Sequence, residues 1–257
     1  MRQFTRLCLF VSLLLLSSTI FAKAPDRYYY QLKIYQLQST TQQQRVEKFL
    51  ETAYVPALHR AGIKSVGVFK TIETDSVKRI YVLIPYQELK QIDAVTKSLA
   101  TDDQYHKAGK DYLDAAYNDQ PYQRMETILL HAFEGMPAPF VPQLTGPKEQ
   151  RVYELRSYEG PTEKYFANKV EMFNKGEIDI FKQLGFNALF YAEALAGGQM
   201  PNLMYMTSFE NKASRDEHWK QFGENAEWKK LSALTAYQNN VSKIHIYFLY
   251  PAGCSDF

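Results

Sequence analysis

One segment of the sequence places three chemically capable side chains on the same face of a predicted strand. In Arg151–Gly160, RVYELRSYEG, the residues Glu154, Arg156 and Tyr158 occupy every second position. Successive side chains of a strand point to opposite faces, so these three share a face. The guanidinium could bind a carboxylate or an enolate of a ligand, and the phenol could exchange a proton.

Two further predicted strands carry similar polar faces. In the segment 123 residues upstream, Lys33 and Tyr35 stand at the equivalent positions. In the last predicted strand, Lys243–Tyr250, His245 and Tyr247 alternate with apolar residues. Because histidine titrates near neutral pH, His245 could serve as a general base.

We expect these polar faces to meet in the interior of the fold, because the apolar faces would pack beneath helices. Charged side chains in a closed interior cost several kcal/mol each unless they are paired or hydrated. In a first interpretation, ion pairs such as Glu154 with Lys33, or Arg156 with Glu126, hold two sheets in register. In a second interpretation, the side chains line a wet cavity that binds a ligand.

The second interpretation gives a set of candidate site residues. The catalytic residues stay unassigned, with His245 and Tyr158 as candidates. Glu177 lies beside an apolar helical stripe and is expected on a solvated flank or in a contact at the helix end. The predicted ligand-binding residues are Lys33, Tyr35, Glu154, Arg156, Tyr158, His245 and Tyr247.

A repeat of 123 residues explains why the polar faces recur. Four pairs of landmarks share that spacing: Tyr30 and Tyr153, Gly62 and Gly185, Tyr86 and Phe209, and Tyr105 and Trp228. Each copy reads as strand, helix, strand, strand, helix pair and strand, the pattern of a ferredoxin-like unit whose sheet has one uncovered face. We therefore predict an α+β fold in which two tandem ferredoxin-like units pack sheet-to-sheet as an intramolecular pseudo-dimer.

The domain boundaries follow from the repeat and from the segment between its copies. Residues 134–150 contain four prolines and two glycines, which predicts a linker. The first unit then covers residues 23–133 and the second covers residues 151–257.

The first 22 residues have the plan of a secretory signal peptide. Arg2 and Arg6 precede the apolar run Leu7–Leu16, and the small residues Ala22 and Ala24 follow it. We predict cleavage after Ala22, with Ala24 as the alternative, and a secreted or periplasmic protein with no stable membrane insertion after cleavage.

Charge and residue spacing exclude several classes of partner. Without residues 1–22 the chain has 28 basic and 28 acidic residues, which leaves no electrostatic footprint for nucleic acid. The histidines show no metal-binding spacing, and Cys254 alone cannot form an internal disulfide. We predict no metal, no cofactor and no nucleic-acid partner, with a small-molecule ligand as the expected partner and a homo-oligomer left open.

The second unit resembles the NIPSNAP family. The resemblance rests on YELRSY, MFNKGEIDIFKQLGF and MPNLMYMTSFEN, followed by HWKQF and EWKKL, and it covers about residues 151–250. The first unit matches less well, because its first strand reads YYQLKIY where the family prefers an acidic residue and an arginine. The resemblance implies the dimeric α/β-barrel fold, whose relatives include monooxygenases, isomerases and proteins with no known reaction.

These observations favour a secreted NIPSNAP-like protein that binds a small, partly aromatic ligand between its two sheets. One alternative is a cofactorless enzyme of the monooxygenase or isomerase type. Another is a structural or interaction protein whose barrel is filled by side chains. A cavity of ligand size between the sheets would favour the first two, and a packed interior would favour the third.

Overall fold

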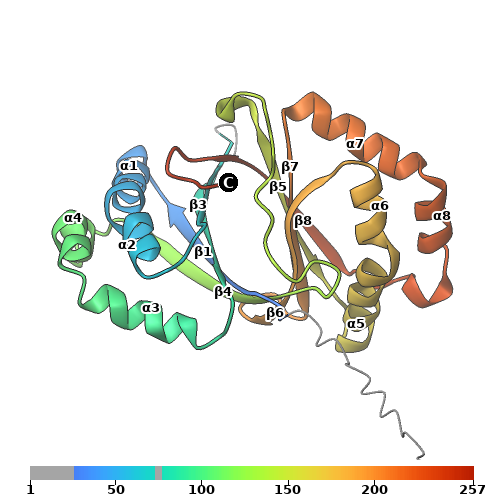
Figure 1. Cartoon of the computed structure of the whole chain (residues 1–257), viewed down its shortest axis with the longest axis horizontal. Helices are drawn as coiled ribbons and strands as arrows, with labels where there is room; N and C mark the ends of the chain where they lie inside the picture. Colours follow the sequence, from blue (N-terminus) through green and yellow to red (C-terminus); the bar gives the residue numbers. More distant parts are fainter. Residues whose placement is uncertain (1–25, 73–76) are drawn as a thin grey trace, which may run out of the picture.

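The computed structural model describes residues 26–72 and 77–257, so the predicted signal peptide lies outside the described residues. Figure 1 shows the strands in the middle of the molecule and helices on both outer sides. The helices of the first half, α1 to α4, lie on one side and those of the second half, α5 to α8, on the other.

The first half contains four strands and four helices in the predicted order. The strands are β1 (Tyr29–Leu37), β2 (Gly67–Thr71), β3 (Lys78–Tyr86) and β4 (Arg124–Ala132). The helices are α1 (Thr40–Phe49), α2 (Val55–Arg60), α3 (Gln91–Ala100) and α4 (Asp103–Leu113), with the π-helical turn η1 (Leu50–Tyr54) joining α1 to α2.

The second half repeats this order. Its strands are β5 (Val152–Glu159), β6 (Asn187–Ala196), β7 (Asn202–Phe209) and β8 (Lys243–Pro251). Its helices are α5 (Glu163–Met172), α6 (Ile178–Gln183), α7 (Lys212–Glu224) and α8 (Ala226–Ser232), and the π-helical turn η3 (Phe173–Glu177) again joins the first two. Between the halves, residues 134–150 are irregular except for the 3₁₀ turn η2 (Lys148–Gln150).

Two glycines end the first long helix of each half, as the repeat predicts. Gly62 has φ +92° and Gly185 has φ +75°, both in the left-handed region that follows many helix C-termini. A side chain at either position would carry the steric cost of that conformation.

All eight strands form one closed antiparallel barrel in the order β1-β3-β2-β8-β5-β7-β6-β4. Each half contributes four adjacent strands, and the ladders β2–β8 and β4–β6 join the halves at both edges. Hydrogen bonding of all the strands around the barrel removes exposed sheet edges. The predicted α+β class with antiparallel sheets is confirmed.

The barrel interior is filled mainly by apolar and aromatic side chains. Tyr30 and Leu32 of β1 and Tyr153 and Leu155 of β5 belong to one buried cluster there. Residues on the opposite face of these strands, including Tyr35 and Tyr158, belong to two separate clusters beneath the helices. The predicted orientation of β1 and β5 is therefore wrong, because the polar faces lie under the helices.

The physical reason is the closure of the barrel. An eight-stranded barrel has an interior just wide enough to be filled by side chains, and charged groups there would lose their hydration. Under the helices, long polar side chains reach partners on the helices themselves. The orientation predicted for β8 is correct: Tyr247 packs on the barrel cluster, and Phe248 lies beneath Arg215 of α7.

Candidate functional site

The structure separates the predicted ligand-binding residues into three places. Lys33 and Tyr35 lie beneath the helices of the first half. Glu154, Arg156 and Tyr158 lie beneath those of the second half. His245 and Tyr247 lie on the barrel side of β8, which is the opposite face of the sheet.

Glu154 is the centre of a closed ionic cluster in the second half. Its carboxylate is fully buried and accepts hydrogen bonds from Arg156 Nε at 2.6 Å, Arg215 Nε at 2.6 Å and Trp219 Nε1 at 2.9 Å. Burial alone would raise the pKa of Glu154, but the hydrogen bond from Arg215 and the charges of Arg156 and Arg215 lower it. The donors saturate the carboxylate, so this cluster serves the packing of α7 on the sheet.

The ion pairs predicted between the two sheets are wrong. Glu154 pairs with Arg156 on its own strand and with Arg215 on α7, and the partner of Lys33 is Tyr54. The reason is the orientation of β5: its polar face points away from the other sheet. Tyr158 donates or accepts a hydrogen bond with Tyr205 at 2.8 Å and accepts one from Arg156.

A second buried ion pair, Lys169 with Glu177, was not predicted. The Nζ–Oε2 distance is 2.7 Å, and both side chains are almost fully buried, so the solvated flank expected for Glu177 is wrong. The two residues are eight positions apart, across the π-helical turn η3. The sequence did contain one signal for this ion pair: Glu177 lies beside an otherwise apolar helical stripe. A buried carboxylate needs a cationic partner, which Lys169 provides.

One end of the barrel contains a small polar cavity. His245 Nε2 lies 2.7 Å from Glu159 Oε1, and Ser157 is hydrogen-bonded to Asn202. Tyr247 and Ser157 line a cavity of about 160 Å³. Ligand pockets usually measure roughly 300–1,000 Å³, so this space is smaller than a typical ligand pocket.

The first half presents a different arrangement around Lys33. Its Nζ donates a hydrogen bond to the hydroxyl of Tyr54 at 3.2 Å. Burial lowers the pKa of Lys33, because the ammonium form loses hydration. Tyr35, on the same face of β1, packs edge-on against Tyr122 with ring centroids 5.5 Å apart, and Tyr112 of α4 packs against the same ring at 5.9 Å.

Lys33 differs from the other shielded lysines of residues 26–72 and 77–257. Three lysines in this part of the chain are not exposed: Lys33, Lys70 and Lys169. Lys70 pairs with Glu47 and Lys169 with Glu177, whereas Lys33 has no described carboxylate within ion-pair distance. The first half therefore leaves a shielded cation without a counter-ion, which the second half does not.

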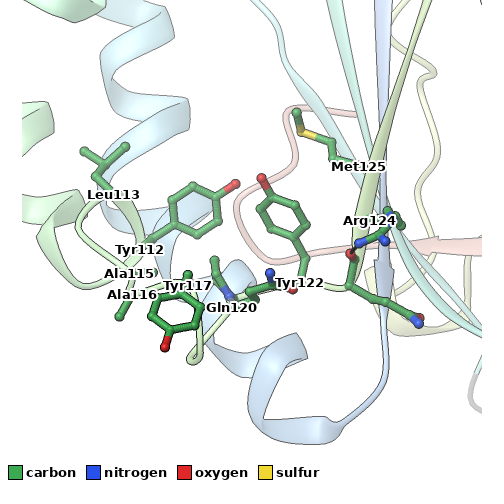
Figure 2. A pocket seen from close by; sticks show the side chains of 11 residues that line it. Tyr112, Leu113, Ala115, Ala116, Tyr117, Gln120, Tyr122, Arg124 and Met125 are labelled. Atoms are coloured by element: carbon green, nitrogen blue, oxygen red, sulfur yellow. Dashed lines mark hydrogen bonds between the residues drawn. The ribbon is translucent and has the colours of Figure 1, made fainter.

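A groove of about 520 Å³ lies next to this lysine, between the end of α4 and the start of β4. Figure 2 shows the rings of Tyr112 and Tyr122 with their hydroxyl groups pointing toward each other. We call this space the tyrosine groove. It is lined by Tyr112, Leu113, Ala115, Ala116, Tyr117, Gln120, Pro121, Tyr122, Gln123, Arg124 and Met125.

Helix α1 fixes the loop that forms the tyrosine groove. Arg45 forms ion pairs with Asp111 and Asp119, both at 2.9 Å, on either side of the loop. Gln42 donates a hydrogen bond to the carbonyl of Gln120 at 2.9 Å. These contacts join residues 66 to 78 positions apart, which explains why the sequence did not reveal the groove.

The tyrosine groove is connected to Lys33 through the strand register. In the register of β1 with β4, Lys33 is paired with Thr127 and Tyr35 with Met125. Thr127, Tyr35 and Met125 therefore lie on the helix side of the sheet together with Lys33. Met125 lines the groove, and Thr127 is exposed to solvent. Tyr122 also interacts electrostatically with Lys33. A ligand in the groove would therefore lie close to a shielded amine.

Comparison with known proteins agrees with this fold. The model of the NIPSNAP family matches residues 153–256, from the first strand of the second half to the end of the chain. Residues 153–256 form a NIPSNAP domain. A NIPSNAP-like domain protein from Burkholderia xenovorans is 15% identical, with 42% of this chain and 90% of that chain covered and a TM-score of 0.39. No curated protein sequence matches this chain.

Larger solved structures resemble the NIPSNAP-domain protein over both halves. A monooxygenase-like protein from Lactobacillus acidophilus is 9% identical, with a TM-score of 0.57 over 88% of this chain and 94% of that chain. An anthrone oxidase-like protein is 8% identical, with a TM-score of 0.54 over 89% and 92% of the two chains. At such low identity the similarity shows the fold alone.

Within residues 26–72 and 77–257, the structure contains neither a cluster of metal-ligand side chains nor a membrane-spanning helix. No group of three or more His, Cys, Asp or Glu side chains in these ranges could hold a metal ion. In the same ranges, no helix of the NIPSNAP-domain protein is both long and apolar enough to cross a membrane.

Proposed function

We propose that this NIPSNAP-domain protein binds a small aromatic ligand in the tyrosine groove of its first half, with an oxygen atom of the ligand directed toward Lys33. The observation that carries the proposal is a groove of about 520 Å³ with three tyrosines in its lining, one of which, Tyr122, interacts electrostatically with the shielded Lys33. The ligand class is the one expected from the sequence, but its place is beneath the helices instead of between the sheets.

The chemistry of the lining supports an aromatic ligand. Tyrosine offers a large flat contact surface together with a hydroxyl group, so it can stack on a ring and hydrogen-bond to its substituents. Arg124 at the groove and Lys33 beside it supply positive charge for a carboxylate, a phenolate or a polarised carbonyl. The volume falls within the usual range for small-molecule pockets, roughly 300–1,000 Å³.

The positions of the tryptophans allow a direct test. Both tryptophans of the chain, Trp219 and Trp228, lie in the second half. Titration with 4-hydroxybenzoate should quench tyrosine fluorescence and leave tryptophan fluorescence unchanged. Tyr122→Leu should abolish the effect, whereas Tyr165→Ser, on the exposed part of α5, should not. Quenching of tryptophan alone would place the site beneath α7 and α8 and overturn the proposal.

A second candidate function is cofactorless oxygenase or isomerase chemistry. The fold neighbours with monooxygenase-like names motivate it, and the hydrogen-bonded pair of Lys33 and Tyr54 could hold or move a proton of a phenolic substrate. Oxygen uptake with a panel of phenols should then fall in Lys33→Met and stay unchanged in His245→Ala. Dependence on His245 would instead favour the barrel end, where that residue pairs with Glu159.

The third alternative, a structural or interaction protein, is supported by the filled barrel interior. It predicts no saturable response to any aromatic ligand in the fluorescence titration.

We also propose that the two halves are tandem ferredoxin-like units that form an intramolecular pseudo-dimer, and that the protein is exported. The repeated strand order within the barrel supports the first proposal, and the order of residues 1–22 supports the second. Expression in a Gram-negative host, followed by fractionation and N-terminal sequencing, tests export. A cytoplasmic protein that retains residue 1 would contradict it.

A further inference from the structure

We propose that Lys33 is a nucleophile that forms an imine with an aromatic aldehyde or ketone bound in the tyrosine groove. This inference rests on the proposed function and specifies its ligand class, since a carbonyl is the oxygen-bearing group that an amine can attack.

The surroundings of Lys33 increase the fraction of the neutral amine, which is the reactive form, relative to an exposed lysine. Its polar contact is a hydroxyl group, Tyr54 Oη at 3.2 Å, and no described carboxylate lies within ion-pair distance. Lys70 and Lys169, the other shielded lysines of the described ranges, each lie within ion-pair distance of a carboxylate, that of Glu47 and that of Glu177. Burial also lowers the pKa of Lys33, and each unit of lowering gives roughly tenfold more neutral amine near pH 7.

A carbonyl compound can reach this amine from the side of β4. Lys33 is only partly buried, and its cross-strand neighbour Thr127 is exposed. Met125, which is 39% exposed, lines the groove one position further along the same face. An aromatic ring in the tyrosine groove would present its substituent toward Met125, which lies on the helix side of the sheet together with Lys33.

Tyr54 can supply the proton transfers of the reaction. The lone pair of Nζ forms a bond to the carbonyl carbon, the carbonyl π bond breaks, and its oxygen takes a proton as the nitrogen loses one, giving a carbinolamine. Loss of that oxygen as water then forms the carbon–nitrogen double bond. Burial raises the pKa of Tyr54 to about 12, so its hydroxyl stays protonated and can donate to the carbinolamine oxygen.

The second half has no amine nucleophile at the position equivalent to Lys33. Arg156 stands where Lys33 stands in the first half, and its guanidinium is paired with Glu154 and covered by Trp219. A guanidinium does not form imines under these conditions, since it stays protonated. Of these two equivalent positions, we therefore expect imine formation at Lys33 and not at Arg156, although the two halves have similar folds.

The test is reductive trapping of the full chain. The protein is incubated with 4-hydroxybenzaldehyde and sodium cyanoborohydride at pH 7, and the sites that gain a 4-hydroxybenzyl group are mapped by peptide mass spectrometry. Lys33 should be modified faster than the exposed Lys64 and Lys107. Tyr54→Phe should slow trapping at Lys33 and leave Lys64 unchanged.

A ligand that cannot form an imine separates this inference from the proposed function. Binding of 4-hydroxybenzoate is measured on the parent chain alongside the trapping, and Lys33→Arg should lose the adduct. Modification of Lys33 no faster than that of Lys64 would overturn the nucleophile, even if 4-hydroxybenzoate binds. Trapping at Lys33 that is unaffected by Tyr122→Leu would keep the nucleophile and remove the groove as its binding site.

Discussion

The guanidinium of Arg156 lies over the indole ring of Trp219, with its Cζ atom 3.6 Å from the ring centroid. At the equivalent positions of the first half, 123 residues earlier, stand Lys33 and Thr96. Thr96 is exposed and donates its hydroxyl hydrogen bond to Ile92 of its own helix. Trp219 of α7 therefore covers Arg156, whereas in the first half Lys33 Nζ lies over the ring of Tyr54, 5.0 Å from its centroid.

This relationship predicts a large structural role for Glu154. Glu154→Gln should lower the free energy of unfolding by about 3–5 kcal/mol, because it leaves the shielded guanidinium of Arg156 without a carboxylate and leaves Arg215 with Asp216 alone. The pKa of Glu154 is lowered in the folded state, so its contribution is present above the unfolded value and is lost as pH falls through the folded value. Urea unfolding at pH 7 and pH 4 checks this. Glu217→Gln, on the exposed face of α7, is the control, and equal stability of both variants at pH 7 would contradict the prediction.

The barrel interior contains a hydroxyl group whose removal should not be harmful. Tyr30 is fully buried, and its hydroxyl has no hydrogen-bond partner among the described residues. An unpaired buried hydroxyl costs about 1–3 kcal/mol, so Tyr30→Phe should leave the melting temperature unchanged or raise it. Tyr205→Phe is the matched control, because it removes a buried hydroxyl that is bonded to Tyr158. Destabilisation of Tyr30→Phe as large as that of Tyr205→Phe would indicate a water-mediated partner.

Lys33 should make the stability of the protein depend on pH in the alkaline range. Its pKa is lowered in the folded state, so the unfolded chain binds more protons between the folded value and the unfolded value of about 10.5. The cost of the shielded ammonium is therefore fully present below the folded pKa and disappears as pH rises toward the unfolded one. Lys33→Met should be more stable than the parent at pH 7, with the gap narrowing by pH 10. A pH-independent gap measured by urea unfolding would argue against a lowered pKa.

The two halves should depend on each other for a closed sheet. Residues 26–133 and 151–257, expressed together as separate chains, should associate, because β2 pairs with β8 and β4 with β6. Expressed alone, each half would expose two sheet edges and the apolar face that lines the barrel, so self-association or aggregation is expected. Two stable monomers in analytical ultracentrifugation would be inconsistent with the shared barrel.

Much of the secondary structure followed from local sequence signals. The order of strands and helices, the helix ends at Gly62 and Gly185 and the equivalence of the two halves depend on periodicity and on backbone preferences. The matched family segment begins at Tyr153, the residue at which the sequence resemblance begins. These features depend on residues that are close together in the chain, so one sequence is enough to predict them.

The orientation of the strands and the location of the site were decided by the tertiary structure. Alternation along β5 defines two faces, but both carry aromatic and polar residues, so the pattern does not state which face lines the barrel. Contacts with α7 decide the orientation of β5, because Arg215 and Trp219 donate hydrogen bonds to Glu154. These residues lie 61 and 65 positions from Glu154 in the sequence. The groove beside Lys33 likewise exists only because Arg45 holds a loop that begins after α4. The sequence by itself determined which side chains share a face, and packing across the whole fold determined what each face meets.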